Sequence, residues 1–263
     1  MLAQKLGLSL PTIKKVGGGA AFDNLYSLDF DHPSKYVDFG DLDIFTPNDS
    51  GANRGFSVSF WVKTTTNRNI ILSKNATGQL EWTVGIGKSG AFEAFLYSGN
   101  SGSDYIVFIT ESTFGSFINL SDGNWHHVAF TFDLTTSATS CQVWIDNVNF
   151  DSTSGATQTF FGTFVSVSNT TAPMIMSTPN TTFIGNLDEV AMFDDVLTLT
   201  NVADIYNSGT PNDISGINYL IGWWRNGDIL GTAVYPTIDD YSTNSNAGTM
   251  TAMASGDIVT DVP

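Results

Sequence analysis

The stretch GNWHHVAFTFD, residues 123–133, decides the fold that the sequence predicts. Every second residue of its apolar part lies on one face, which holds Val128, Phe130 and Phe132. A period of two is typical of a β-strand with one side in a core. Neighbouring side chains of a strand point to opposite faces, so His126 and His127 are not expected to bind one metal ion together. We expect His126 to hydrogen-bond near the strand start, and replacement of His127 by Ala to cost little stability.

Two further stretches repeat this alternation. In GFSVSFWVK, residues 55–63, one face holds Phe56, Val58, Phe60 and Val62. In CQVWID, residues 141–146, one face holds Cys141, Val143 and Ile145. Turn-rich segments such as KNATGQ and YSGNSGSD separate these stretches at the spacing of an antiparallel meander or Greek key. The sequence therefore predicts an all-β protein of two packed sheets.

One short helix interrupts the strand pattern. The stretch LTNVADIYNSG, residues 199–209, offers Thr200 as an N-cap and Gly209 just past the end. The helix is expected to pack its apolar face on an edge or an end of a sheet.

Composition and charge restrict the partners of the chain. Its 26 acidic and 10 basic residues give a net charge of -16 over 263 residues, which disfavours nucleic acids and anionic membrane surfaces. No apolar run reaches the roughly 20 residues that span a bilayer. The single cysteine, Cys141, excludes an internal disulfide, and residues 1–16 lack the features of a signal peptide. We expect a protein made in the cytoplasm, without membrane insertion.

Five segments in order resemble the laminin-G-like, concanavalin-A-like jelly-roll domains. They are YSLDFDHPSKYVDFGD, FSVSFWVK, GNWHHVAFTFD, CQVWIDN and FIGNLDEVAMFDDVLT, and they cover roughly residues 25–210. The resemblance implies a jelly-roll sandwich of two antiparallel sheets. It also implies that the two adjacent histidines belong to a structural strand.

The expected domain organisation has two parts. Residues 1–21 are interpreted as an N-terminal arm with a Gly hinge, or alternatively as a frayed terminus. Residues 22–263 are expected to form the laminin-G-like domain. Residues 220–250 resemble the segment that usually opens such a domain, so either the domain is circularly permuted and residues 220–263 complete the sandwich, or they form a C-terminal extension.

A catalytic site is not expected. Glycosidases that share this sandwich need two carboxylates about 5 to 10 Å apart on one face of a cleft. The nearest candidates, Asp188 and Glu189, are sequence neighbours and are expected to face opposite ways. Cys141 is expected on the side of its strand that faces the core, so nucleophilic catalysis is not expected there either.

A structural Ca²⁺ ion is implied by the resemblance, with oxygen ligands near the first and last strands. Asp188 matches best, and Asp31 and Asp29 are possible neighbours in the sequence. Asp240 is a second candidate, in a segment rich in Ser and Asn. The alternative for each is a solvated carboxylate that organises a turn.

Three tryptophans are candidate ligand-binding residues. Each of them alternates with the core residues of its strand and is expected on the outer face: Trp61, Trp125 and Trp144. Exposed aromatic rings can stack on the apolar side of a sugar. The alternative is that loops or terminal segments cover this face, and that the tryptophans form a second small core.

Two functions follow as expectations. The first is a non-enzymatic virion structural or display protein, such as a capsid decoration, fibre or adhesin, because laminin-G-like domains of this layout are similar to those in virion proteins of tailed phages. Its partners would be other virion proteins or further copies in a homo-oligomer, attached through the terminal segments. The second is a glycan-binding lectin or adhesin that uses the tryptophans, and a glycosidase is a distant third.

Overall fold

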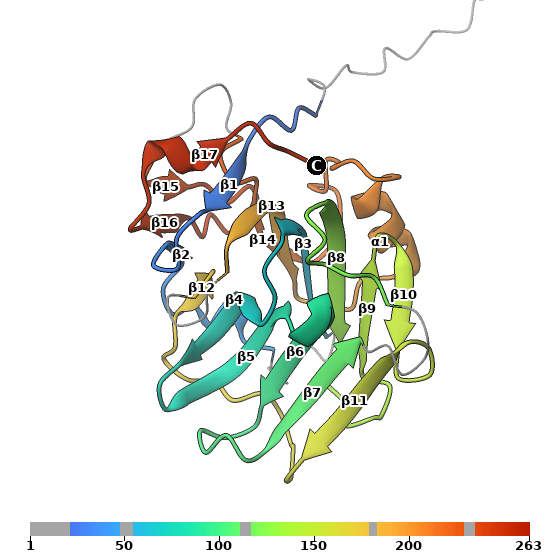
Figure 1. The fold of residues 1–263 in the computed structure, drawn as a ribbon. Coiled ribbons are helices and arrows are strands. Elements are labelled where there is room, and N and C mark those ends of the chain that lie inside the picture. Colours follow the sequence, from blue (N-terminus) through green and yellow to red (C-terminus); the bar gives the residue numbers. More distant parts are fainter. Residues whose placement is uncertain (1–21, 48–54, 111–116, 179–182, 229–234) are drawn as a thin grey trace, which may run out of the picture.

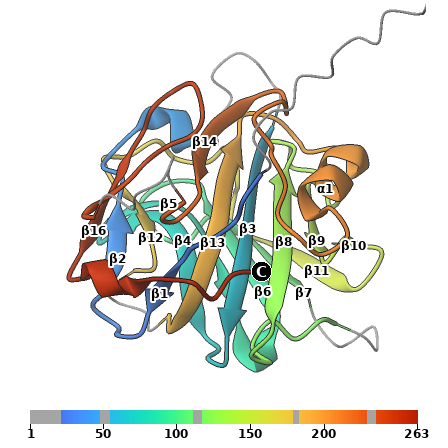
Figure 2. The ribbon, with the colours of Figure 1, turned by 90° about the horizontal axis from the view of Figure 1, so that it is seen from above.

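A computed structural model describes residues 22–47, 55–110, 117–178, 183–228 and 235–263, so the predicted arm and hinge at residues 1–21 lie outside the described residues. Two antiparallel sheets pack face to face, with one short α-helix beside them (Figures 1 and 2). The predicted all-β sandwich with one short helix is confirmed. None of the described helices is long and apolar enough to cross a membrane.

Sheet 1 has eight strands in the described part of the chain. Its order is β10 (Val148–Asp151), β9 (Cys141–Ile145), β8 (Trp125–Phe132), β3 (Phe56–Thr64), β13 (Gly185–Phe193), β1 (Ser27–Phe30) and β17 (Ile258–Val259), and β14 (Leu220–Trp224) also pairs with β13. Short 3₁₀ turns at Asp43–Phe45, Lys88–Gly90 and Ser255–Asp257 lie outside the strands.

Sheet 2 has nine strands among the described residues. Its order is β11 (Ala156–Phe161), β7 (Tyr105–Thr110), β6 (Phe92–Tyr97), β5 (Gln79–Ile86), β4 (Asn69–Ala76), β12 (Met174–Met176), β2 (Tyr36–Asp38), β16 (Gly248–Thr251) and β15 (Thr237–Ile238). Figure 1 shows β4, β5, β6, β7 and β11 side by side in the lower part of the molecule.

The core between the sheets has the predicted strand parity. In β8, the residues of the predicted inner face, Val128, Phe130 and Phe132, are fully buried in the core between the sheets. The ring of Phe130 contacts two rings from sheet 2, with centroids 5.5 Å from Phe92 and 5.9 Å from Phe108. Burial of such aromatic faces from both sheets is the main stabilising interaction of the sandwich.

Residues 220–263 contribute to both sheets. β14 and β17 pair in sheet 1, and β15 and β16 pair in sheet 2. Trp224 is fully buried between the sheets, against Phe39 and Phe45, and its Nε1 donates a hydrogen bond to the carbonyl of Asn246. This segment is therefore part of the sandwich.

Helix α1 (Leu199–Tyr206) has its N-cap two residues before the N-cap predicted at Thr200. The N-cap is Thr198, whose Oγ1 accepts a hydrogen bond from the backbone N–H of Asn201. The Asn201 side chain accepts one from the backbone N–H of Thr198, and this reciprocal box fixes the start. The helix lies beside β8, β9 and β10 in both views, on the outer face of sheet 1 (Figures 1 and 2).

Candidate carbohydrate-binding surface

Two of the three predicted ligand-binding tryptophans are covered. Trp61 is only 3% exposed and stacks on Tyr206 of α1, with ring centroids 5.9 Å apart. Trp144 is 5% exposed and belongs to an apolar cluster with Val202 and Ile205 of the same helix. The expected exposed aromatic face is thus wrong for these two residues, because α1 covers the outer face of sheet 1. The alternative, a second small core, is what the structure contains.

Trp125 remains partly exposed at the start of β8. Its Nε1 donates a 3.0 Å hydrogen bond to the Asp261 carboxylate, which also accepts one from Lys63 Nζ at 2.7 Å. These contacts attach the C-terminal residues to sheet 1. Part of the Trp125 ring is therefore occupied by the chain itself.

The two adjacent histidines occupy different surroundings. His126 hydrogen-bonds to Asp146 at 2.7 Å and to Asp122 at 3.1 Å. Burial by itself lowers the pKa of His126, but these carboxylates outweigh it, so the pKa is raised. His127 is fully buried on the outer face beneath α1, and burial lowers its pKa to about 3. Its Nε2 hydrogen-bonds to Ser59 at 2.8 Å, so His127→Ala would empty a buried site and remove this bond, and the structure favours a larger loss of stability than the sequence alone predicts.

The four aspartates predicted as calcium ligands lie in three different settings. Asp29 and Asp31 lie near each other, where burial and then the charge of Asp31 raise the pKa of Asp29. Asp188, on β13, is fully buried and accepts a 2.8 Å hydrogen bond from the Asn24 side chain. Asp240 accepts four hydrogen bonds, each 2.8 Å long, and organises a turn. Across the described ranges, no three His, Cys, Asp or Glu residues are grouped to hold a metal ion.

Asp188 and Glu189 do not face opposite ways, contrary to the sequence prediction. The pairing of β13 with β3 shifts between Asp188 and Ala191, and Glu189 has a φ of +45°, so the strand bulges there. Asp188 lies opposite Trp61 in the ladder, on the outer face. Glu189 accepts a hydrogen bond from Trp223 Nε1, in the same outer layer. The bulge therefore brings both carboxylates to one face.

This carboxylate pair is buried, and its hydrogen bonds hold neighbouring segments of the chain together. Glu189 also accepts a 3.0 Å hydrogen bond from Arg225, which stacks over the ring of Phe22 at 4.2 Å. Burial raises the pKa of Glu189 to about 7 against the effect of Arg225, and burial followed by the charge of Glu189 raises that of Asp188. Both side chains lack the open cleft that a glycosidic substrate requires.

A row of four aromatic rings lies on the outer face of sheet 2. We call it the aromatic strip, and it consists of Phe95, Tyr97, Tyr105 and Phe161, from strands β6, β7 and β11. Along β6 these outward rings alternate with core residues, as a strand requires. All four are partly or well exposed, and Phe161 is 42% exposed.

The rings of the strip form a continuous series of contacts. Centroids are 6.1 Å apart for Phe95 and Tyr97, 5.7 Å for Tyr97 and Tyr105, and 4.6 Å for Tyr105 and Phe161. The strip crosses three strands, which is about 10 Å at the usual strand spacing. Burial, and then the neighbouring Tyr105 and Glu93, raise the pKa of Tyr97, so this hydroxyl stays protonated at neutral pH.

Sequence reasoning missed this strip because it considered only tryptophans. The signal was present in FEAFLY, YIVFIT and ATQTFF, where aromatic residues recur at the parity opposite to the core. Parity alone does not distinguish an open outer face from one covered by a helix. That distinction depends on where α1 packs, which is a tertiary contact.

The comparisons with known proteins agree with this architecture. The chain has 14% identity to a candidate carbohydrate-binding protein from Bacteroides ovatus ATCC 8483, at a TM-score of 0.50, with 91% of this chain and 60% of that chain covered. The chain thus spans 60% of the length of that protein.

Two other solved structures are less similar. A heptameric SAP-like pentraxin from Limulus polyphemus has 16% identity and a TM-score of 0.42, with 70% of this chain and 83% of that chain covered. Domains LG4-5 of the mouse laminin alpha1 chain have 12% identity and a TM-score of 0.41, with 64% and 41% covered. No curated protein sequence matches the chain. Nothing in these likenesses points to a virion, so that expectation stays a prediction.

The family is shown by a sequence match as well as by the fold. Residues 35–203, more than half of the chain, match the family model of laminin-G type described as the concanavalin A-like lectin/glucanases superfamily. The matched range contains the strand from which the fold was predicted, β8, and all four residues of the aromatic strip. This chain belongs to the concanavalin A-like lectin/glucanase superfamily.

Proposed function

We propose that the chain is a carbohydrate-binding module of the lectin type, which holds an oligosaccharide against the aromatic strip. The observation that carries the proposal is the strip itself, four contacting rings on the outer face of sheet 2. Aromatic rings offer flat apolar surfaces to the C–H faces of sugar rings, and contiguous exposed rings of this kind mark binding surfaces.

The length of the strip favours an oligosaccharide over a single sugar. Phe95 on β6 and Phe161 on β11 lie on either side of β7, so the rings follow a line across three strands and do not surround one point. Several sugar rings of one chain can therefore contact aromatic groups together. Each contact is weak, and their sum gives useful affinity.

The charge of the molecule favours neutral glycans. The net charge of -16 repels sulfated and uronic-acid polymers over most of the surface. Glu93 lies beside the strip and its charge acts on Tyr97, so it adds a local negative charge. Both effects select hydroxyl-rich, uncharged ligands.

We propose binding without hydrolysis. Hydrolysis of a glycosidic bond needs two carboxyl groups on either side of the bond. The pair that approaches this description, Asp188 and Glu189, is buried in sheet 1 and holds Asn24 and Arg225. The aromatic strip lies on the other sheet.

A glycan array tests this function. Labelled full-length protein is applied to neutral, sulfated and uronic-acid oligosaccharides at two salt concentrations. We expect retention on neutral oligosaccharides that salt hardly changes, because stacking contacts are not screened. Retention confined to sulfated or uronic-acid glycans, or none on any glycan, contradicts the proposal. Display on a virion, as a homo-oligomer or with other virion proteins, stays a prediction, and an image of the chain in its native assembly tests it.

A further inference from the structure

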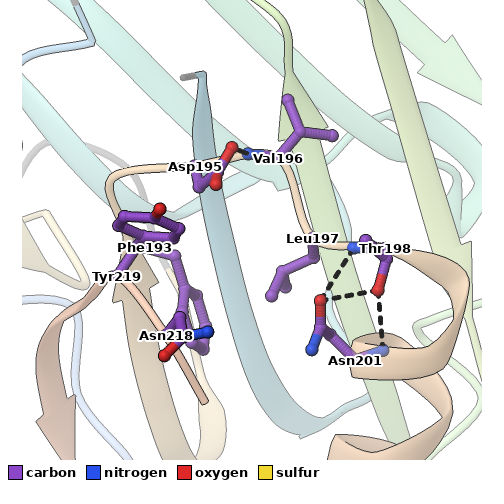
Figure 3. Close-up of a pocket in the computed structure, with 8 residues that line it drawn as sticks. All are labelled: Phe193, Asp195, Val196, Leu197, Thr198, Asn201, Asn218 and Tyr219. Atoms are coloured by element: carbon purple, nitrogen blue, oxygen red, sulfur yellow. Dashed lines mark hydrogen bonds between the residues drawn. The ribbon is translucent and has the colours of Figure 1, made fainter. Parts of the chain in front are cut away.

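A small pocket opens where β13 ends and α1 begins. Its volume is about 190 Å³, and its walls are Phe193, Asp195, Val196, Leu197, Thr198, Asn201, Asn218 and Tyr219. Figure 3 shows Phe193 and Tyr219 on one side of the pocket and the Thr198–Asn201 pair on the other. We infer that this pocket binds a single neutral sugar residue and is a second carbohydrate site, separate from the aromatic strip.

The polar groups of the pocket suit sugar hydroxyls. One carboxylate oxygen of Asp195 accepts the backbone N–H of Val196 at 2.8 Å, and within the described residues the other oxygen accepts no hydrogen bond. The Asn201 side-chain oxygen is used by Thr198, whereas its amide N–H groups donate to no described residue. The Asn218 side chain likewise has no described partner. A carboxylate acceptor and two amides can together bind adjacent hydroxyl groups.

An exposed aromatic ring completes the pocket. Tyr219 lines the pocket and is 48% exposed, so part of its ring is open to a ligand. Its backbone has a φ of +63°, a left-handed conformation that is uncommon for a residue with a bulky side chain. The Tyr219 carbonyl accepts a 2.9 Å hydrogen bond from the backbone of Asp194, which holds this conformation. The Tyr219 ring therefore extends from a held backbone at the wall of the pocket, where it can stack on a sugar.

Size and charge define the ligand class. The volume is below the roughly 300 Å³ at which pockets for drug-sized molecules begin, so one ring fits and a folded chain does not. Asp195 lines the pocket and its lining residues include no Lys or Arg, so sialic and uronic acids are disfavoured. The ligand expected is a neutral hexose at the end of a glycan.

The pocket and the aromatic strip belong to different sheets. The pocket contains residues of β13 and the start of α1, in the layer of sheet 1, whereas the strip lies on sheet 2. The ligand class rests on the proposed carbohydrate-binding function, but the site is independent of the strip. One module with both sites can bind the terminal sugar of one glycan in the pocket and several consecutive sugars of another glycan along the strip.

Titration of ¹⁵N-labelled full-length protein with methyl α-glycosides of glucose, galactose, mannose and N-acetylglucosamine tests the inference. For one of them we expect saturable shifts of the side-chain amide signals of Asn201 and Asn218, with a Kd of about 1 mM or weaker. Tyr219→Phe keeps the ring and is expected to keep this affinity. Tyr219→Ala and Asn218→Ala are expected to weaken it roughly 3- to 10-fold.

The outcomes separate the two sites. Phe161→Ala removes a strip ring and is expected to leave the monosaccharide shifts unchanged. Absence of shifts at Asn201 and Asn218 with all four glycosides overturns the pocket inference, even if oligosaccharides shift the signals of Tyr97 and Tyr105. Monosaccharide shifts that persist unchanged in both Tyr219→Ala and Asn218→Ala also overturn it.

Discussion

The rings of Tyr105 and Phe161, on neighbouring strands β7 and β11, stack with centroids 4.6 Å apart and planes 15° from parallel. In a sandwich, such cross-strand pairs usually help to bury a face. Here Phe161 keeps 42% of its surface exposed, at the edge strand of sheet 2. Covering this surface with a ligand removes apolar area from water, which favours binding.

Phe130 and Phe161 form a matched pair for the stability of the fold. Phe130→Ala empties a fully buried site between the sheets and is expected to lower the free energy of unfolding by about 3 to 5 kcal/mol. Phe161→Ala removes the same atoms from an exposed position and is expected to cost about 1 kcal/mol or less. Urea unfolding of both variants measures the difference. Equal costs contradict the assignment of inner and outer faces.

The cap of α1 provides a second matched pair. Thr198→Ala removes the hydroxyl that accepts the Asn201 N–H, and a cost of about 0.5 to 2 kcal/mol is expected. Thr200→Ala, in the first turn, is exposed and is expected to change stability by less than about 0.5 kcal/mol. Thermal denaturation of the two variants checks this order, and a larger loss for Thr200→Ala restores the N-cap predicted from the sequence.

The strand alternation predicted much of this structure because its cause is local. A period of two in residues 55–63, 123–133 and 141–146 specifies which side chains enter the core between the sheets, and the residues of that core are the predicted ones. The outward parity of Trp61 and Trp144 was also right. Their exposure was not, because α1 covers them, and this depends on contacts between segments far apart in the chain.

Two other differences have local causes that parity cannot show. The bulge at Glu189 adds one residue to β13 and places Asp188 and Glu189 on the same face. The N-cap is Thr198 because Asn201 closes the capping box, whereas Thr200 has the right residue type at the wrong spacing. The outward position of the strip residues was predictable from the strand alternation. Their exposure to solvent was not, because it depends on which segments cover the sheet.

His126 and His127 are expected to give opposite pH dependences. The pKa of His127 is about 3 when folded, below the roughly 6.5 of an unfolded chain, so the unfolded state binds more protons between these values. Stability then falls on acidification below about pH 6.5 by up to about 1.4 kcal/mol per pH unit, and His127→Gln removes this loss.

For His126 the sign is reversed. Its pKa is raised in the folded state, so its contribution is fully present below about pH 6.5 and is lost as pH rises through the folded pKa. The wild-type advantage over His126→Gln is therefore expected to grow at acidic pH. Urea melts of wild type and both variants between about pH 5 and 8 measure these differences. Parallel curves for the two variants contradict the distinct surroundings of the two histidines.

Calcium is expected to leave the melting temperature unchanged. The predicted ligands Asp29, Asp31, Asp188 and Asp240 lie in three settings, and Asp240 already accepts four hydrogen bonds. A site saturated at 100 times its Kd stabilises a protein by about 2.7 kcal/mol. Thermal melts with CaCl₂ and with EDTA measure the effect. A rise in melting temperature with CaCl₂ that EDTA reverses supports the calcium site implied by the sequence.

The most direct test of the proposed function is calorimetric titration of wild type and variants with a neutral oligosaccharide that the array identifies. Phe161→Ala and Tyr105→Ala are each expected to lose at least about 1 kcal/mol of binding free energy, roughly fivefold in Kd. Trp125→Ala, outside the aromatic strip, is expected to bind like wild type. Full affinity in both strip variants, or a loss only in Trp125→Ala, contradicts the assignment of carbohydrate binding to the aromatic strip.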